Sequence, residues 1–225
     1  MTETLENLFV YLATYAPLVP ICFFGWKFPS VGKNLILRLA IIYCAVEFTV
    51  NFSALWLSNS AIRLTYSIFT AIEYGIFAFQ LFLLISHKLS RKLIVSLSVL
   101  FFLFWTVFRF YGKYDVLDSV PIGVETILIL AFAFRFLFEQ MDNVSEGFIY
   151  TRYSFWIAAG LMIYLSGSFF CYLYANQVTD QVRNVFWMFQ NIFSIFKSIC
   201  FTISIVIAAK WKLSAPKTKI HKLSF

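Results

Sequence analysis

Seven long apolar runs, separated by short polar segments, constrain this chain more than any other feature of its sequence. A membrane-spanning helix needs about 17–25 predominantly apolar residues. Seven segments reach that length: about 6–26, 35–57, 64–86, 92–111, 117–138, 153–175 and 184–210. The chain is 61% hydrophobic and 13% charged, whereas soluble domains are about 45–50% apolar and about 25% charged. The sequence therefore predicts an all-α, polytopic membrane protein, with seven transmembrane helices forming a single membrane domain over residues 1–225.

The lysines and arginines between the runs predict how the helices are oriented. Of the eighteen, thirteen fall on one side, four on the other, and Lys197 lies inside the last run. Cytoplasmic loops carry the excess of basic residues, so we expect the N-terminus outside and the C-terminus in the cytoplasm of the plasma (inner) membrane. Residues 211–225 are expected to form a basic cytoplasmic tail. The start of the chain lacks the positive region of a signal peptide, so the first run is expected to be retained as a span.

The sequence lacks the residues that several classes of function require. The basic residues follow the loops rather than one face, which argues against a nucleic-acid partner. Serine nucleophiles need a base, but no GxSxG motif is present and no histidine lies in the runs. The four cysteines have no metal-ligand spacing, and the two histidines, His87 and His221, fall outside the runs. We therefore expect no enzyme activity, no catalytic residue, no metal site and no cofactor.

Four ionisable residues lie well inside the apolar runs. Glu47 lies near the middle of the second run, Glu73 near the middle of the third and Glu125 about nine residues into the fifth, while Lys197 lies at the middle of the seventh. An ionisable group within a membrane span is costly and marks a functional site by default. Three acids and one base at similar depth predict a buried polar centre, in which all three acids cannot be ionised side by side.

Helical spacing predicts which polar neighbours share the faces of these four residues. Tyr43, Glu47 and Asn51 are four apart, and an amide-rich stripe precedes Lys197 in the last run. Lipid cannot satisfy such groups, so each stripe is expected to face the bundle interior. The expected centre for a ligand or a proton consists of Glu47, Asn51, Glu73, Tyr74, Glu125, Tyr164, Gln190, Asn191 and Lys197. Which acid pairs with Lys197 is open, and so is the alternative that the set only fixes helix register.

Two other features of the runs bear on helix shape. Glycines at 160 and 167 in the sixth run are expected to let a neighbouring helix approach closely. Pro17 and Pro20 in the first run and Pro121 in the fifth are expected to produce ordinary kinks.

The sixth run carries a family resemblance. Its segment Phe155-Trp156-Ile-Ala-Ala-Gly160-Leu-Met-Ile-Tyr164-Leu-Ser-Gly167 resembles a signature, FWxxxGxxIYxxG, of a family of uncharacterised small bacterial seven-span membrane proteins. The acid in the second run, Glu73-Tyr74 in the third and the amide-rich start of the last also resemble that family. The resemblance implies the seven-span architecture and the inner membrane, and it carries over no catalytic role.

Two functions fit this pattern, and a third is remote. We favour a sensor-like or accessory protein whose centre binds a small ligand or a partner helix, in the lipid bilayer and beside a membrane or cytoplasmic signalling partner. The alternative is a proton-coupled small-molecule transporter, in which one of the acids exchanges protons. A retinal-binding protein would use Lys197 with Glu73 as counterion. However, Phe193 stands where those proteins have an acid or a serine, four residues before the lysine.

Overall fold

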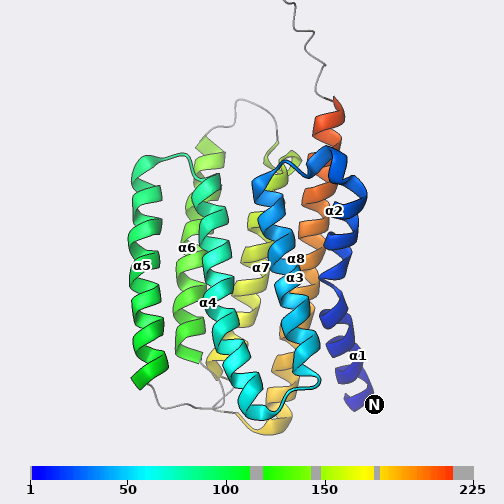
Figure 1. The fold of residues 1–225 in the computed structure, drawn as a ribbon, viewed down its shortest axis with the longest axis vertical. Coiled ribbons are helices and arrows are strands. Elements are labelled where there is room, and N and C mark those ends of the chain that lie inside the picture. The colour runs from blue at the N-terminus through cyan, green and yellow to red at the C-terminus, as the bar shows by residue number, and fades with distance from the viewer. Residues whose placement is uncertain (1, 112–118, 143–147, 175–177, 215–225) are drawn as a thin grey trace, which may run out of the picture.

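The computed structural model describes residues 2–111, 119–142, 148–174 and 178–214. These ranges hold α-helices and one short 3-10 helix, and no strand occurs in them (Figure 1). The elements in order are α1 (Thr2–Tyr15), α2 (Leu18–Val31), α3 (Leu35–Ala54), α4 (Asn59–Leu84), α5 (Lys88–Tyr111), α6 (Ser119–Asp142), η2 (Ile149–Thr151), α7 (Tyr153–Tyr174) and α8 (Asp180–Ser214).

Seven helical segments in the described part of the chain are long and apolar enough to cross a membrane: Glu6–Val31, Leu35–Ala54, Ala61–Leu84, Lys88–Phe110, Val120–Asp142, Tyr153–Tyr174 and Val182–Lys210. Each contains most of one predicted run. The predicted all-α fold with seven candidate spans is therefore confirmed for these residues. Of the expected basic tail, residues 215–225 lie outside the described ranges.

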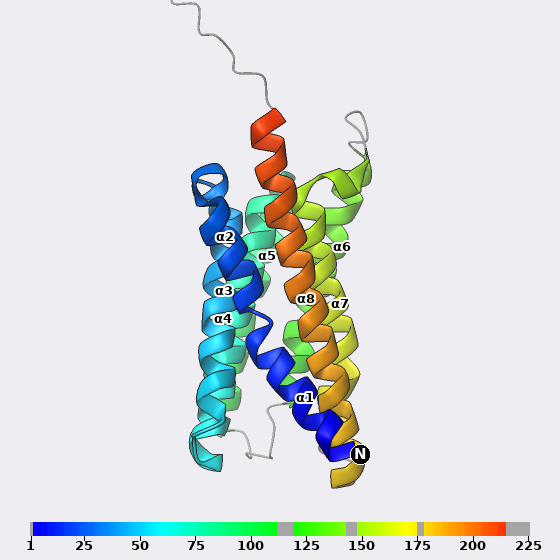
Figure 2. The same ribbon diagram turned by 90° about the vertical axis from the view of Figure 1, so that its right-hand side faces the viewer.

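The first span differs from its expected form, because it is two helices rather than one kinked helix. Pro17 has no N–H to donate, so the carbonyl of Ala13 loses its usual partner. The N–H of Ala16 still bonds to Leu12, at 2.8 Å, but the N–H of Val19 turns to Ala16, at 3.1 Å. Figure 2 shows α1 crossing the start of α8 obliquely, with a change of direction between α1 and α2. The break brings the end of α1 toward the bundle interior, where Ala13 is 3% exposed.

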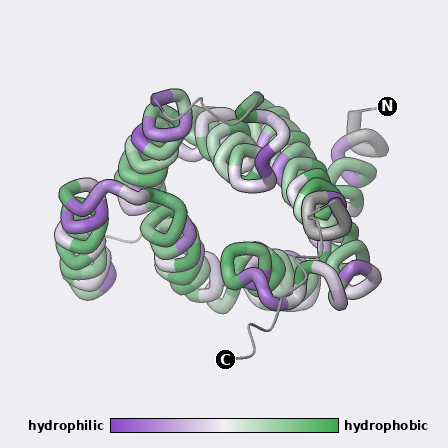
Figure 3. The backbone as a smooth tube through the Cα atoms, turned by 90° about the horizontal axis from the view of Figure 1, so that it is seen from above, coloured by the Kyte–Doolittle hydropathy of each residue, from purple (hydrophilic) through white to green (hydrophobic). Residues whose placement is uncertain are grey.

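The spans form a ring whose interior holds a hydrophobic core together with buried polar side chains, and α5 lies at its edge. Seen along the long axis, α5 lies outside the ring, beside α4 and α6 (Figure 3). It is the least buried of the seven spans, and its outer face is a row of exposed leucine, valine and phenylalanine side chains. Such a face suits contact with lipid. The other spans supply the interior of the ring.

Close packing of α7 on α8 depends on glycine, as the sequence predicts. A Cβ atom at Gly160 would lie 2.9 Å from the Cβ of Cys200 and 3.4 Å from the backbone oxygen of Lys197. A Cβ at Gly167 would collide with the ring of Phe193. The absence of side chains at these two positions lets the backbones approach, which sets where α8 presents Lys197.

A carboxylate on α6 ties the helices together at the end of the bundle where α5 begins. Glu139 accepts hydrogen bonds from the backbone N–H groups of Ser86, at 3.0 Å, and His87, at 2.7 Å. These N–H groups precede the first turn of α5, where a helix has no internal acceptors for them. Glu139 therefore caps α5 from a neighbouring helix.

Replacing Glu139 with alanine is expected to lower the free energy of unfolding by about 1–2 kcal/mol, the usual cost of losing a capping acceptor. Chemical unfolding in detergent micelles would measure this change. Glu6→Ala is the matched control, because Glu6 is partly exposed and its hydrogen bond from Asn184, the one it accepts among the described residues, is 3.5 Å long. Equal stabilities of the two variants would contradict the capping role.

Candidate functional site

A buried ion pair between α8 and α3 lies at the centre of the polar interior. The Nζ atom of Lys197 lies 2.7 Å from Oε1 of Glu47. Lys197 is 0% exposed and Glu47 4% exposed. The same carboxylate oxygen accepts a hydrogen bond of 2.8 Å from Ser194, one turn before the lysine. Glu47 is thus the acid that pairs directly with Lys197, which the sequence left undecided.

Tyr43 connects this ion pair to the second acid. Lys197 donates to the Tyr43 hydroxyl at 2.5 Å, and that hydroxyl donates to Oε1 of Glu73 at 2.7 Å. The ring of Tyr164 on α7 covers the lysine, with Nζ 3.6 Å from the ring centroid. A hydrogen-bonded chain therefore runs from Glu47 through Lys197 and Tyr43 to Glu73, across α3, α8 and α4. We call this chain the buried relay.

Glu125 on α6 is the third acid, and it stands apart from the buried relay. Its side chain is 1% exposed, yet Oε1 has no hydrogen-bond partner among the described residues. It lies close enough to Glu73 for the two carboxyl groups to interact electrostatically. The centre therefore holds three carboxyl groups and the single amine of Lys197, which Glu47 and Tyr43 already engage.

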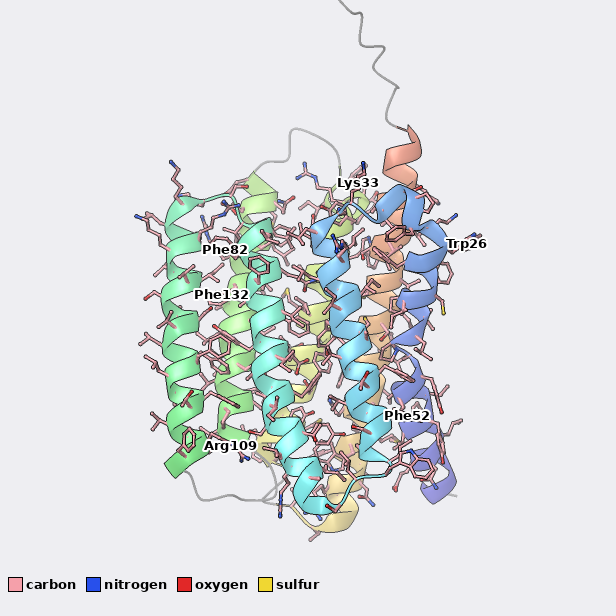
Figure 4. All side chains as sticks on the ribbon, viewed as in Figure 1. Trp26, Lys33, Phe52, Phe82, Arg109 and Phe132 are labelled. Carbon is pink, nitrogen blue, oxygen red and sulfur yellow. The ribbon has the colours of Figure 1, made fainter. Side chains whose placement is uncertain are left out.

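A cavity of about 970 Å³ opens beside the buried relay. Seven of the nine residues expected at the centre line it: Glu47, Asn51, Glu73, Glu125, Tyr164, Gln190 and Asn191. The lining comes from the last turns of α1, α3 and α7 and from the first turns of α4, α6 and α8, so the cavity lies in the half of the bundle that holds the N-terminus (Figure 1). Arg109, near the end of α5, marks the same half in Figure 4.

Aromatic and amide side chains form much of the wall. Gln190 donates to the hydroxyl of Tyr172 at 2.9 Å, and the Tyr172 ring meets Trp187 edge-on, with 5.6 Å between centroids. Tyr66 and Arg63 line the cavity from α4. The cavity thus has acids at its inner end, aromatic rings along its wall, and arginines toward the end of the bundle.

Two residues expected at the centre do not line the cavity. Tyr74 faces α5 instead: its hydroxyl lies 3.0 Å from Ser98, and its ring stacks on Phe101 with centroids 3.9 Å apart. Successive helical residues are about 100° apart, so the neighbour of inward-facing Glu73 faces α5 instead. Lys197 belongs to the buried relay behind the cavity wall. Its enclosure by Glu47 and Tyr164 gives no support to the retinal hypothesis.

Sequence reasoning left several functional candidates out. Tyr43 was recognised as a neighbour of Glu47 on one stripe, but its bridging role was not predicted. Ser168 and Tyr172 follow the expected residue Tyr164 at spacings of four on α7, and they also line the cavity. The spacing of four is present in the sequence, on a helix whose glycines at 160 and 167 pack on α8.

Among the described residues, no group of three or more histidine, cysteine, aspartate or glutamate side chains is placed to hold a metal ion. In comparisons with known proteins, no family model, no curated protein and no solved structure matches the chain. The resemblance of the sixth span to small bacterial seven-span proteins therefore stays a prediction, and function has to be argued from the site itself.

Proposed function

We propose that this chain is a sensor-like or accessory protein of the plasma (inner) membrane, whose polar centre binds a small ligand. The observation that carries the proposal is the cavity beside the buried relay. Helix bundles pack to crystal-like density, so a centre that only fixed helix register would be filled by its own side chains. A cavity of about 970 Å³ lined by carboxyl, amide and aromatic groups instead has the size and chemistry of small-molecule sites, which are about 300–1,000 Å³.

The distribution of basic residues supports an orientation with the cavity facing outward. Lys27, Lys33, Lys88 and Arg152 lie at or near the end of the bundle opposite the N-terminus, together with most other described basic residues. The half that holds the cavity has Arg63, Arg109 and Arg183. Under the positive-inside rule, the cavity side is outside, so a ligand would enter from there rather than from the cytoplasm.

The buried relay supports a sensing role. Glu73 both lines the cavity and accepts from Tyr43, and Tyr43 contacts Lys197 on α8. A ligand that engages Glu73 would compete with Tyr43 and thereby change the contact among α3, α4 and α8. Because α8 continues to Ser214 at the opposite end, a change in its position would reach the cytoplasmic face, where a separate signalling partner could respond.

A proton-coupled transporter is the second candidate, and the feature that favours it is Glu125. Oε1 of this buried carboxyl group has no hydrogen-bond partner among the described residues, and the group interacts with Glu73, a second acid at the end of a hydrogen-bonded chain. Such a group resembles the carboxyl groups that carry protons in membrane transporters. Transport would require the site to open alternately to both sides.

Reconstituted protein distinguishes the two functions. We expect small ligands to raise the unfolding temperature of the purified protein, since saturation at one hundred times Kd stabilises by about 2.7 kcal/mol. In liposomes, we expect neither pH-gradient-driven uptake of those ligands nor a proton leak. Glu73→Gln should weaken the thermal response while the fold persists, because a glutamine oxygen can still accept from Tyr43. Uptake driven by a pH gradient would support the transporter function instead. An unfolding temperature that no ligand changes would contradict the sensor function.

A further inference from the structure

We propose that the cavity binds an organic ammonium ion, whose positive group lies between Glu125 and Glu73. This proposal rests on the ligand-binding function above and names the class of ligand. Four features carry it: the surplus of acids, an unpartnered oxygen, the aromatic wall and the lack of a metal-binding cluster.

The surplus of acids favours a cation. Lys197 donates to Glu47 and Tyr43 within the buried relay and lies under the ring of Tyr164. Among the described residues its ion pair is with Glu47 and not with Glu125 on α6. An anion entering the inner end would meet three carboxyl groups. A neutral molecule without a donor would leave Oε1 of Glu125 unpaired and buried, at a desolvation cost of about 1–3 kcal/mol. A ligand with a positive group would be attracted by both Glu125 and Glu73, which line the same cavity.

The aromatic wall favours an organic cation over a bare ion. Tyr66, Tyr172 and Trp187 line the cavity, and aromatic faces attract ammonium groups through their π electrons. The same chemistry already operates beside the cavity, where the ring of Tyr164 covers the ammonium of Lys197 at 3.6 Å.

Metal ions fit the cavity poorly. Divalent cations need several oxygen ligands close together, whereas no cluster of three acids among the described residues is placed to hold one. The volume of about 970 Å³ also greatly exceeds the space that a coordinated ion occupies. Apolar side chains such as Ile122 and Leu165 line part of the wall, where they suit carbon atoms of a ligand.

Two arginines in the cavity wall favour a negative group at the end of the ligand that lies away from the ammonium group. Arg63 and Arg109 line the cavity toward the outer end of the bundle (Arg109 in Figure 4). A carboxylate at the far end of an ammonium compound would meet these guanidinium groups, so zwitterionic ammonium compounds fall within the proposed class. Simple anions do not, because they would lack a partner for Glu125.

Three molecules of nearly equal shape test the role of charge. Choline, 3,3-dimethylbutan-1-ol and 3,3-dimethylbutanoate carry a positive, a neutral and a negative group in turn. Each would be titrated into the purified full-length chain, alongside tetraalkylammonium ions from methyl to butyl, with binding followed by thermal unfolding and calorimetry. We expect at least one ammonium ion to bind, and to bind at least tenfold more tightly than any neutral or anionic analogue.

Glu125→Gln is expected to weaken ammonium binding at least tenfold. Oε1 of Glu125 has no partner among the described residues, so this variant should fold. Glu6→Gln is the matched control, because it removes one acid at the same end of the bundle but outside the cavity lining, and it should bind as the unmodified protein does. Trp187→Leu is a second test of the wall, and it should weaken binding of the ammonium ion more than binding of the neutral alcohol.

The outcomes separate this proposal from the one on which it rests. Binding of the neutral or anionic analogue as tightly as the ammonium ions, unchanged in Glu125→Gln, would overturn the ammonium assignment and leave a ligand-binding cavity. Equal weakening in Glu125→Gln and Glu6→Gln would also overturn it, since general surface charge would then explain the selectivity. If no compound of any charge binds, both the ammonium proposal and the ligand-binding function fail.

Discussion

Replacing Lys197 with methionine is expected to lower the free energy of unfolding by about 3–5 kcal/mol, the usual cost of removing one partner of a buried ion pair. The substitution keeps most of the side-chain volume but leaves Glu47, 4% exposed, without its cation. It also removes the donor to Tyr43, which is 0% exposed and bonded to Glu73. Chemical unfolding in detergent micelles measures the change.

A double variant separates two costs of Lys197→Met: the loss of the attraction between Lys197 and Glu47, and the burial of an unpaired charge on Glu47. In Lys197→Met/Glu47→Gln the remaining group is a neutral amide that still accepts from Ser194. We therefore expect the double variant to be more stable than Lys197→Met alone, because removing both charges of a buried pair costs less than removing one. A Lys197→Met variant within about 1 kcal/mol of the unmodified protein would show that the ion pair does not hold the centre together.

Replacing Gly160 with leucine is expected to cause the second large loss of stability, because it disturbs the packing of α7 on α8. A Cβ atom at this position would lie 2.9 Å from the Cβ of Cys200 on α8, so α7 and α8 must separate. Overpacking of this kind costs about 1–3 kcal/mol for added methylene groups, and occasionally more. We expect the upper end of that range, since the closest atoms belong to a helix backbone and a first side-chain carbon that cannot rotate away.

Gly25→Leu is the matched control for this packing effect. A Cβ at Gly25 on α2 would meet nothing within 4 Å, so the same change of residue should be nearly neutral there. The Gly160 variant should also bind ligand more weakly, since Lys197 is displaced along with α8. Equal stability of the two glycine variants, measured by unfolding in the same detergent, would contradict the account of α7 and α8 as a closely packed pair.

The sequence was sufficient to predict the helices and most of the polar centre, for a simple physical reason. Lipid forces each span to be long and apolar, so ionisable residues such as Glu47, Glu73 and Lys197 stand out against that background. Their helical spacing then indicates inward faces. For this reason seven of the nine expected residues line one cavity, although whether they bind a ligand is the proposal and not a property of the spacing.

The pairing within the centre was not predictable, because it depends on how helices are rotated and how deep each one sits. Glu47 and Glu73 lie at similar depths in their spans. Glu47 nevertheless contacts Lys197 directly, whereas Tyr43 bridges Lys197 and Glu73. Tyr74 lies outside the cavity lining for a related reason, because adjacent positions on one helix face different neighbours. The break between α1 and α2 also depends on tertiary contacts, since a proline permits either a kink or an interruption.

Access to the polar centre from the outer side of the membrane is tested most directly by a matched pair of serines. Ser168 lines the cavity at 2% exposed, whereas Ser204 is 0% exposed and does not line it. Both hydroxyls donate to a backbone oxygen of their own helix at 2.6 Å. Each would be changed to cysteine after the four native cysteines are replaced by alanine.

The measurement is the rate at which a membrane-impermeant trimethylammonium-ethyl thiosulfonate labels each cysteine in right-side-out vesicles. We predict that Ser168→Cys is labelled from outside, more slowly when tetraalkylammonium ions are present, and that Ser204→Cys is not. Labelling of neither cysteine from outside, or labelling of Ser168→Cys only in inverted vesicles, would contradict the proposed outward-facing site.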